Sequence, residues 1–284
     1  MNAQPESKDG SNQAARESPA IVQANGLNNR ELSSPDPGPP PDGGLQAWSQ
    51  AGVAHLIMFN SWGYINSFGV FQDYYVAALD ASPSAISWVG SVQIFLIFFV
   101  GTFSGRATDA GHYRTVVMAG SLLQLIGVFM TSLSTKYWQL FLAQGLCTGL
   151  GDGLVFCPTI ALLATYFVKK RAMAIAINAS GAGTGGVVFP LIARQLLSRI
   201  GFAWTVRTMG FVMLFNVLII ISLARTRLPP RKLGPIVEWS VFREVPYSLF
   251  CIGMFLNFWA VFFAYYYVCL SCSQPRPAWL RSTS

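Results

Sequence analysis

The sequence predicts an all-α protein that crosses a membrane several times, and two observations support this fold class. Hydrophobic residues make up 52% of the 284 residues and charged residues only 11%, whereas a soluble domain normally carries about 25% charged residues. From Trp48 onward, long apolar runs alternate with short basic stretches. Water is therefore not the main solvent of this chain, which excludes a single soluble domain.

Residues 1–46 form a polar head that we expect to be a disordered cytoplasmic tail. Seven prolines occur within residues 1–41, and such a segment buries too little apolar surface to offset the cost of ordering its backbone. The head contains three basic and six acidic residues. Because it lacks the pattern of a cleavable signal peptide, we expect the first membrane helix to act as the targeting signal.

Seven apolar runs are long enough to cross the bilayer, since a helix needs about 20 residues to span about 30 Å of hydrocarbon. They cover residues 48–71, 84–104, 115–134, 138–166, 172–196, 205–223 and 246–268. The predicted organisation is a six-helix unit over residues 47–223, a basic cytoplasmic linker over 224–245, a seventh helix over 246–268 and a short polar end over 269–284.

The basic residues predict that the N-terminus lies in the cytoplasm, because Lys and Arg near helix ends are retained on that side. An N-inside start gives the inner loops Arg106, Arg114, Lys169, Lys170, Arg171, Arg225, Arg227, Arg231, Lys232 and Arg243. The outer loops then hold only Lys136, Arg194, Arg199 and Arg207. We expect a multi-pass protein of the lipid bilayer, and the plasma membrane is preferred over vacuolar or other internal membranes.

Several other classes of protein are disfavoured. The bases separate hydrophobic runs and do not form a continuous basic face, so no nucleic acid is expected as a partner. Two histidines, His55 and His112, do not provide a metal centre, and no nucleophile and base pair is visible. We therefore predict no enzyme activity, no metal and no cofactor. The five cysteines do not form a disulfide framework.

Glycines at four-residue spacing predict close contacts between helices. They are Gly145, Gly149 and Gly153 in the fourth run and Gly181 and Gly185 in the fifth. In a bilayer, such small faces let helix backbones approach, and that contact is a main source of packing energy. Packing is the preferred interpretation, and room for a solute beside the glycines is the alternative.

Two signatures carry a resemblance to a known family. One precedes the first run and consists of Asp42, Gly43, Gly44 and Trp48; the other joins the fourth and fifth runs and consists of Tyr166, Phe167, Lys169, Lys170 and Arg171. Together they resemble the monocarboxylate-porter family of the major facilitator superfamily, and the long polar head resembles its fungal branch. Leu45 stands where the family has an aromatic residue, and the family has twelve spans where this chain has seven.

The resemblance implies a fold and an activity. The expected fold is the N-terminal six-helix bundle of that superfamily, two inverted three-helix repeats, with a seventh helix added. The expected activity is secondary transport of a monocarboxylate or related metabolite by alternating access, with protons as a candidate co-substrate. A truncated or partner-dependent half-transporter is the alternative, and a seven-helix sensor is a third, disfavoured by the N-inside charge pattern. The oligomeric state is left open.

A loop between the second and third runs resembles, in a degenerate form, the loop at the same place in the superfamily. Asp109 and Arg114 remain, whereas Ala110 stands at a basic position of the family pattern. An acid and a base at the end of a helix can hold neighbouring helices in one of two states. We therefore predict a gating role for Asp109 and Arg114, with solvated loop charges as the alternative.

Candidate solute contacts are polar residues within the spans, because an unpaired polar atom in hydrocarbon costs several kcal/mol. Asn60 and Tyr64 share a helical face of the first run, and Asn66 lies to one side. By resemblance, Asn66 occupies the position of a lysine that attracts a carboxylate in animal members. The neutral amide makes a neutral or polyfunctional metabolite as credible as a monocarboxylate.

Two further candidates lie in later runs. An ionised carboxylate such as Asp152 near the middle of a span costs about 2.5 to 3.5 kcal/mol, so we predict a group that exchanges a proton or binds solute, with interhelical hydrogen bonding as the alternative. Asn257 lies on the seventh run, which by the same resemblance lines the central cavity. The remaining intramembrane amides, Gln93, Gln144, Asn178 and Asn216, are at least as consistent with interhelical hydrogen bonds.

Overall fold

The computed structural model describes residues 38, 40–227 and 241–273. Most of the predicted cytoplasmic head, most of the predicted linker and residues 274–284 of the predicted polar end lie outside the described residues. Within the described part every regular element is a helix, as the sequence predicts.

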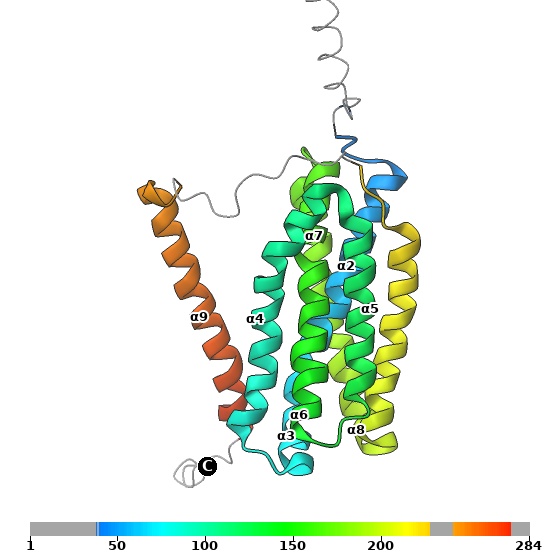
Figure 1. The fold of residues 1–284 in the computed structure, drawn as a ribbon, viewed down its shortest axis with the longest axis vertical. Helices are drawn as coiled ribbons and strands as arrows, with labels where there is room; N and C mark the ends of the chain where they lie inside the picture. Colours follow the sequence, from blue (N-terminus) through cyan, green and yellow to red (C-terminus); the bar gives the residue numbers. More distant parts are fainter. Residues whose placement is uncertain (1–37, 39, 228–240, 274–284) are drawn as a thin grey trace, which may run out of the picture.

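From α2 to α8 the helices follow one another along the chain with short connections. Their bounds are α2 Gly44–Asn66, α3 Phe68–Leu79, α4 Pro83–Ala107, η1 Thr108–His112, α5 Tyr113–Thr131, α6 Tyr137–Leu140, η2 Phe141–Thr148, α7 Gly149–Tyr166, α8 Arg171–Leu223, η3 Val241–Arg243 and α9 Val245–Ser273. Figure 1 shows α2, α4, α5, α7 and the two arms of α8 running side by side as a bundle, with α9 tilted on the α4 side and apart from the bundle over most of its length.

Glycine sets the two sharpest reversals of the chain. Pro83–Thr131 and Arg171–Leu223 are continuous helical stretches of 49 and 53 residues, far longer than a bilayer crossing needs. Gly111 (φ 90°) interrupts the first stretch and Gly201 (φ 76°) interrupts the second. Both adopt the left-handed conformation that glycine tolerates without steric cost. Each stretch is therefore a pair of antiparallel arms, in line with the predicted second and third runs and fifth and sixth runs.

By length and composition, three described helical stretches can cross a membrane: Pro83–Thr131, Tyr137–Tyr166 and Arg171–Leu223. α2 is 23 residues long but is not among them, because amides and a histidine lower its hydropathy. It nevertheless lies inside the bundle, between α7 and α8 (Figure 1). A helix of this composition is stable there because neighbouring helices, and not lipid, cover most of its surface.

The first run differs from its predicted bounds at both ends. Its helix begins at Gly44, before the predicted start at 48, and stops at Asn66, before the predicted end at 71. Ser67 explains the stop, since its hydroxyl donates to the carbonyl oxygen of Tyr64 at 2.6 Å and competes with the helical pattern. α3 then continues the chain as a separate helix that ends at Asp80, which adopts a left-handed conformation.

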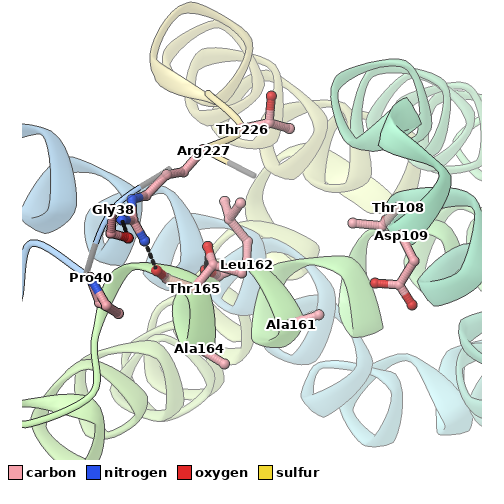
Figure 2. A pocket seen from close by; sticks show the side chains of 10 residues that line it. All are labelled: Gly38, Pro40, Thr108, Asp109, Ala161, Leu162, Ala164, Thr165, Thr226 and Arg227. Atoms are coloured by element: carbon pink, nitrogen blue, oxygen red, sulfur yellow. Dashed lines mark hydrogen bonds between the residues drawn. The ribbon is translucent and has the colours of Figure 1, made fainter. Parts of the chain in front are cut away.

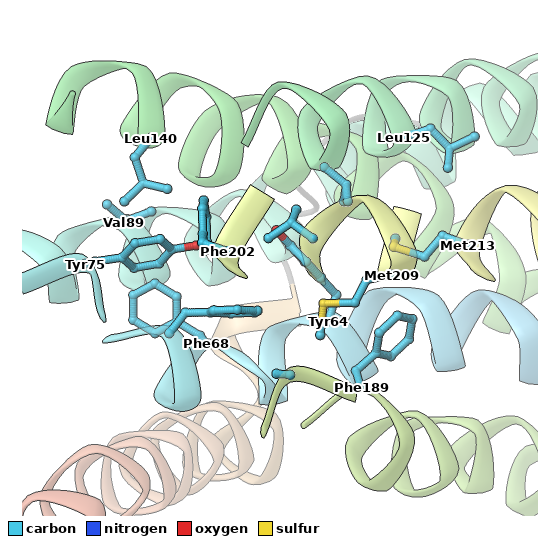
Figure 3. Close-up of a cluster of buried hydrophobic side chains, with 14 of the residues drawn as sticks. Tyr64, Phe68, Tyr75, Val89, Leu125, Leu140, Phe189, Phe202, Met209 and Met213 are labelled. Atoms are coloured by element: carbon cyan, nitrogen blue, oxygen red, sulfur yellow. The ribbon is translucent and has the colours of Figure 1, made fainter. Parts of the chain in front are cut away.

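The apolar core forms two clusters at opposite ends of the bundle. One surrounds Tyr64, Tyr75, Phe189 and Met209 and joins α2, α3 and both arms of α8 (Figure 3). The other contains Ala47, Ala51, Tyr113, Tyr166 and Phe167, near the start of α2. Between them lies a layer of buried polar side chains that includes Asp152, Gln93 and Gln124.

The glycines at four-residue spacing lie at helix crossings. On the η2 and α7 side, a Cβ built at Gly145, Gly149 or Gly153 would lie 3.3, 3.0 or 2.6 Å from backbone atoms of α4. On α8, a Cβ at Gly181 or Gly185 would overlap the carbonyl oxygen of His55 or Phe59 on α2. These contacts let the backbones approach more closely than any larger residue allows.

Two glycines of α8 provide a matched test of this packing. Gly181→Ala places its methyl group against a carbonyl oxygen of α2, so we expect destabilisation by about 1 to 3 kcal/mol from overpacking. Gly183→Ala on the same helix meets no atom within 4 Å, and we expect it to be neutral or to stabilise by up to about 1 kcal/mol. Thermal unfolding of both variants in one detergent measures the difference. Equal melting temperatures for the two variants would contradict the close α2–α8 contact.

Candidate functional site

A buried carboxylate connects four helices at the centre of the bundle. Asp152 of α7 has an exposed fraction of 0%. Gln93 of α4 donates to its Oδ2 at 3.1 Å, and Gln124 of α5 donates to its Oδ1. The same Gln124 amide also lies 3.3 Å from the Ser61 hydroxyl of α2. In this conformation the carboxylate therefore binds neighbouring helices, as the interpretation of interhelical hydrogen bonding expects.

The other intramembrane amides mostly bind neighbouring helices too. Asn216 of α8 donates to Oδ1 of Asn60 on α2 at 2.8 Å. The Tyr75 hydroxyl of α3 donates to Oε1 of Gln144 on η2, also at 2.8 Å. Asn178 of α8 is buried as well. Gln93, Gln144 and Asn216 therefore act as interhelical ties in this conformation, which is the interpretation that the sequence left open beside solute contact.

The candidate solute contacts from the sequence do not gather in one place. Asn60 and Tyr64 do share a face of α2, but that face points into the bundle, with exposed fractions of 1% and 0%. Asn66 lies on the other side of the helix, half-buried beside Gly186 of α8. Asn257 is exposed on α9. The polarity of a residue identified these positions, but polarity alone does not say whether a neighbouring helix or a solute satisfies it.

A second stripe of α2 faces outward, and the sequence reasoning did not select it. His55, Phe59, Trp62 and Asn66 follow one another at i, i+4, i+7 and i+11 and are all half-buried, whereas most residues between them are buried. This spacing is the signal that could have identified the stripe, because it places all four side chains on one helical face.

The His55 ring ties this stripe to α8. Its Nδ1 lies 3.0 Å from the carbonyl oxygen of Ile177 and 3.2 Å from the Ser180 hydroxyl, and its Nε2 lies 3.3 Å from the Thr184 hydroxyl. Ser180 and Thr184 are exposed at the edge of the same face. Further along α2, the Trp62 ring meets Phe156 of α7 edge-on, with 6.1 Å between the ring centroids.

A cavity of about 490 Å³ lies at the end of the bundle where the N-terminal segment enters (Figure 2). Its lining includes Thr108 and Asp109 of η1, Leu162 and Thr165 of α7, and Arg227 beyond α8. Asp109 is exposed at its rim.

The two predicted gating residues, Asp109 and Arg114, lie on either side of the reversal at Gly111. Arg114 lies at the start of α5, beyond the left-handed Gly111. Within the described residues, no hydrogen bond or ion pair joins Arg114 to Asp109. The gating role of the two residues therefore stays a prediction.

The two sequence signatures meet in space. Oδ1 of Asp42 accepts hydrogen bonds from the backbone N–H groups of Val168 and Lys169, at 2.6 and 2.7 Å, and from that of Lys170 at 3.5 Å. The backbone N–H of Asp42 donates to the carbonyl oxygen of Tyr166 at 3.2 Å. Asp42 thus fastens the segment before α2 to the tight turn before α8, and we call this contact the Asp42 latch.

The latch also fixes the charge of its carboxylate. The N–H of Val168, with those of Lys169 and Lys170, holds the pKa of Asp42 below its ordinary value, because these hydrogen bonds favour the ionised form. Desolvation opposes this lowering of the pKa only in part.

Next to the latch, the Trp48 ring packs against Phe167 with 5.0 Å between centroids. The side chains of Lys169, Lys170 and Arg171 remain exposed.

The end of α8 is tied to the same region of the bundle. Gln50 of α2 donates to the carbonyl oxygen of Leu223 at 2.8 Å and accepts from the backbone N–H of Arg225 at 3.2 Å. The Tyr166 hydroxyl donates to the carbonyl oxygen of Arg225 at 3.2 Å. The Arg227 guanidinium donates to the carbonyl oxygens of Thr165 and Gly38 at 2.8 and 2.7 Å. We call this set of hydrogen bonds the α8 clamp.

Comparisons with known proteins agree on a family. A family model described as Major Facilitator Superfamily matches residues 52–271. An MFS-type transporter of Gibberella zeae is 50% identical over 255 residues, which are 89% of this chain and 58% of that protein. An aspyridones efflux protein of Emericella nidulans is 38% identical over 238 residues, which are 83% of this chain and 48% of that protein. The chain thus spans about half the length of these relatives.

Solved structures agree on the fold. The crystal structure of a peptide transporter, POT, in complex with sulfate has a TM-score of 0.57 to this chain at 17% sequence identity. The match covers 76% of this chain and 47% of the peptide transporter. The similarity concerns the arrangement of helices, and at this identity it carries no information about the solute.

Removing the latch should loosen the turn before α8. In Asp42→Ala the N–H groups of Val168 and Lys169 lose their acceptor, so we expect faster deuterium exchange of the peptide covering residues 167–171 at neutral pH. Asp42→Asn, which keeps an acceptor without the charge, should lie between Asp42→Ala and the unmodified chain. Asp73→Ala on the exposed side of α3 is the matched control and should leave that exchange unchanged.

The latch also has a defined pH dependence. Because its folded-state pKa is lowered, the carboxylate stabilises the fold above the ordinary Asp pKa of about 3.9. That contribution disappears as the pH falls through the lowered value. The difference in exchange between Asp42→Asn and the unmodified chain should therefore be constant at neutral pH and vanish in acid. A difference that grows on acidification would contradict the assignment.

Proposed function

Because the chain belongs to the Major Facilitator Superfamily, we propose that it supplies the first half of a secondary transporter that moves a small organic solute across a membrane. The observation that carries this proposal is the family match over residues 52–271, together with a bundle of paired antiparallel helices. Proteins of this superfamily move solutes by rocking one bundle against another around a site near the bilayer midplane. This is transport and not enzymatic catalysis.

The relatives and the signatures support a proposed transport direction and a proposed solute class. One relative is an efflux protein for aspyridones, which supports export of a small organic metabolite. The Asp42 latch joins both signatures of the monocarboxylate-porter-like family, which supports membership of its fungal branch. The proposed solute class is therefore a monocarboxylate or a related metabolite.

The proposed topology keeps the predicted division of the chain. Residues 47–223 form the six-helix half, residues 224–245 the basic linker, and residues 246–268 the first helix of the second half. The N-terminus, the latch and the α8 clamp lie on the cytoplasmic side, which assigns Lys169, Lys170 and Arg227 to that side in agreement with charge retention. The plasma membrane is the proposed location.

Within this proposal the buried and surface residues have different roles. Asp152, tied to Gln93 and Gln124, takes up a proton when the halves rock, because an ionised carboxylate without a cation at this depth is costly. Asn60 and Tyr64 position α2 in the present conformation and line the solute path in the alternative state of the transport cycle. Asn66 and Asn257 contact the solute directly. Asp109 and Arg114 close the cytoplasmic end by pairing in the state opposite to the present one.

A transport assay tests both the function and the proton role. We expect a cell that expresses the chain together with the C-terminal part of the Gibberella zeae relative to export added monocarboxylates or related metabolites faster than a cell with either part alone. In Asp152→Asn the amide fits the same site, and we expect expression to be preserved while the pH dependence of export is lost. Unchanged pH dependence in Asp152→Asn would remove the proton role. Equal export by the chain alone would show that the second bundle is not required.

The topology is tested by accessibility of single cysteines. On a background without the five native cysteines, Thr226→Cys at the α8 clamp should react with a membrane-impermeant maleimide only after the cytosolic side is opened. Thr135→Cys in the exposed turn before α6 is the matched control and should react from outside in intact cells. The reverse pattern would overturn the N-inside orientation.

A further inference from the structure

The outward stripe of α2 has the chemistry of a binding wall for one part of the transported solute. We propose that His55, Phe59, Trp62 and Asn66, with Ser180 and Thr184 of α8 and Phe156 of α7, contact an uncharged, ring-bearing part of that solute. This inference rests on the proposed function, because it assumes that a solute passes along this face.

The charge pattern selects an uncharged ligand group. α2, α7 and residues 172–193 of α8 contain a single charged residue, Asp152, and its side chain is fully buried. The outward stripe therefore carries neither a cation for a carboxylate nor an anion for an amine. A charged solute group placed there would lose its hydration without gaining an opposite charge.

The aromatic side chains select a ring. Trp62 and Phe156 meet edge-on at 6.1 Å, and Phe156 continues to Phe98 of α4, whose ring lies 5.8 Å away in a similar edge-on arrangement. Trp62 and Phe156 are half-buried and leave faces and edges available to a further ring, whereas the exposed Phe98 also meets Phe258 of α9 at 5.7 Å. The three rings therefore form a continuous apolar surface from α2 across α7 to α4.

Hydrogen-bonding groups border the aromatic surface. The Trp62 indole N–H is itself buried and has no hydrogen-bond partner among the described residues, so the ring presents its half-buried apolar part to the outside. Towards the latch end of the stripe, the hydroxyls of Ser180 and Thr184 are held by the His55 ring at 3.2 and 3.3 Å and remain exposed. Both hydroxyls already donate to carbonyl oxygens of their own helix, Ser180 to Ile177 at 2.7 Å and Thr184 to Ser180 at 3.1 Å. The stripe as a whole therefore suits a neutral, largely apolar ring.

Within the proposed solute class, the stripe favours acids that also carry a neutral ring over simple aliphatic monocarboxylates. A small aliphatic acid offers a charge that finds no partner on the stripe and no ring for the aromatic surface. Any anionic group of the solute must therefore face the second bundle, while its neutral ring lies against α2 and α7.

Photolabelling of the purified chain in lipid nanodiscs tests this wall without a transport assay. The probe is 4-methoxybenzophenone, a neutral ring ketone, and its matched anion is 4-benzoylbenzoate. We expect the neutral probe to label peptides that contain residues 55–66 or 177–187 saturably, and the anion to label them several-fold less. Labelling by the anion that equals or exceeds that of the neutral probe would overturn the inference.

Substitutions locate the contact on the stripe. Trp62→Leu should lower saturable labelling roughly two- to tenfold, the range expected for loss of one aromatic pair, and Trp62→Phe should retain most of it. Trp204→Leu, which removes a 56% exposed tryptophan from the second arm of α8, is the matched control and should change nothing. Equal effects of Trp62→Leu and Trp204→Leu would overturn the assignment, and so would loss of labelling in Trp62→Phe with a folded chain.

The outcomes separate this inference from the proposed function. The stripe could be labelled with the expected pattern although the chain and its second bundle give no export. That result would support the binding wall and contradict the transport proposal. Export that persists unchanged in Trp62→Leu would keep the transport proposal and remove the wall.

Discussion

The close approach of α2 and α8 is the contact on which the rest of the bundle depends. Gly181 and Gly185 bring α8 against the carbonyl oxygens of His55 and Phe59, and a Cβ at Gly63 would lie 2.7 Å from the Cα of Gly185. Only at this separation do the His55 ring and the Ile177 carbonyl, 3.0 Å apart, come within hydrogen-bonding distance. The polar composition of α2, which would be costly against lipid, is therefore tolerated because α8 encloses it.

The polar layer between the two apolar clusters gives the bundle its specificity. Lipid tails are as apolar as leucine, so apolar contacts alone do not strongly favour one arrangement of helices over another in a bilayer. Asp152 with its two glutamines, and Asn60 with Asn216, each require a particular register of the helices that they join. Glycine contacts thus provide proximity, and the amide and carboxylate ties determine which faces meet.

Much of the fold follows from the sequence because each run had to satisfy a length set by the bilayer, whereas the site was harder to predict. The all-α class and the glycine faces could be predicted from spacing and hydropathy. The break at Ser67 could not, since a serine hydroxyl that bonds its own helix leaves no signal in composition. The Asp42 latch joins residues 126 positions apart, and nothing in either signature indicates that the two meet. Asn60 and Tyr64 share a face as predicted, yet that face is the enclosed one, where Asn60 accepts a hydrogen bond from Asn216 and the Tyr64 ring belongs to the apolar core.

The α8 clamp has a mechanical consequence. Gln50, Tyr166 and Arg227 hold the last turn of α8 and the residues after it against α2, α7 and the N-terminal segment. A force applied to the chain beyond Arg227 is consequently distributed over the hydrogen bonds of Gln50, Tyr166 and Arg227. It does not act on the last turn of α8 alone. Such a force therefore acts on the bundle through α2, α7 and the N-terminal segment together.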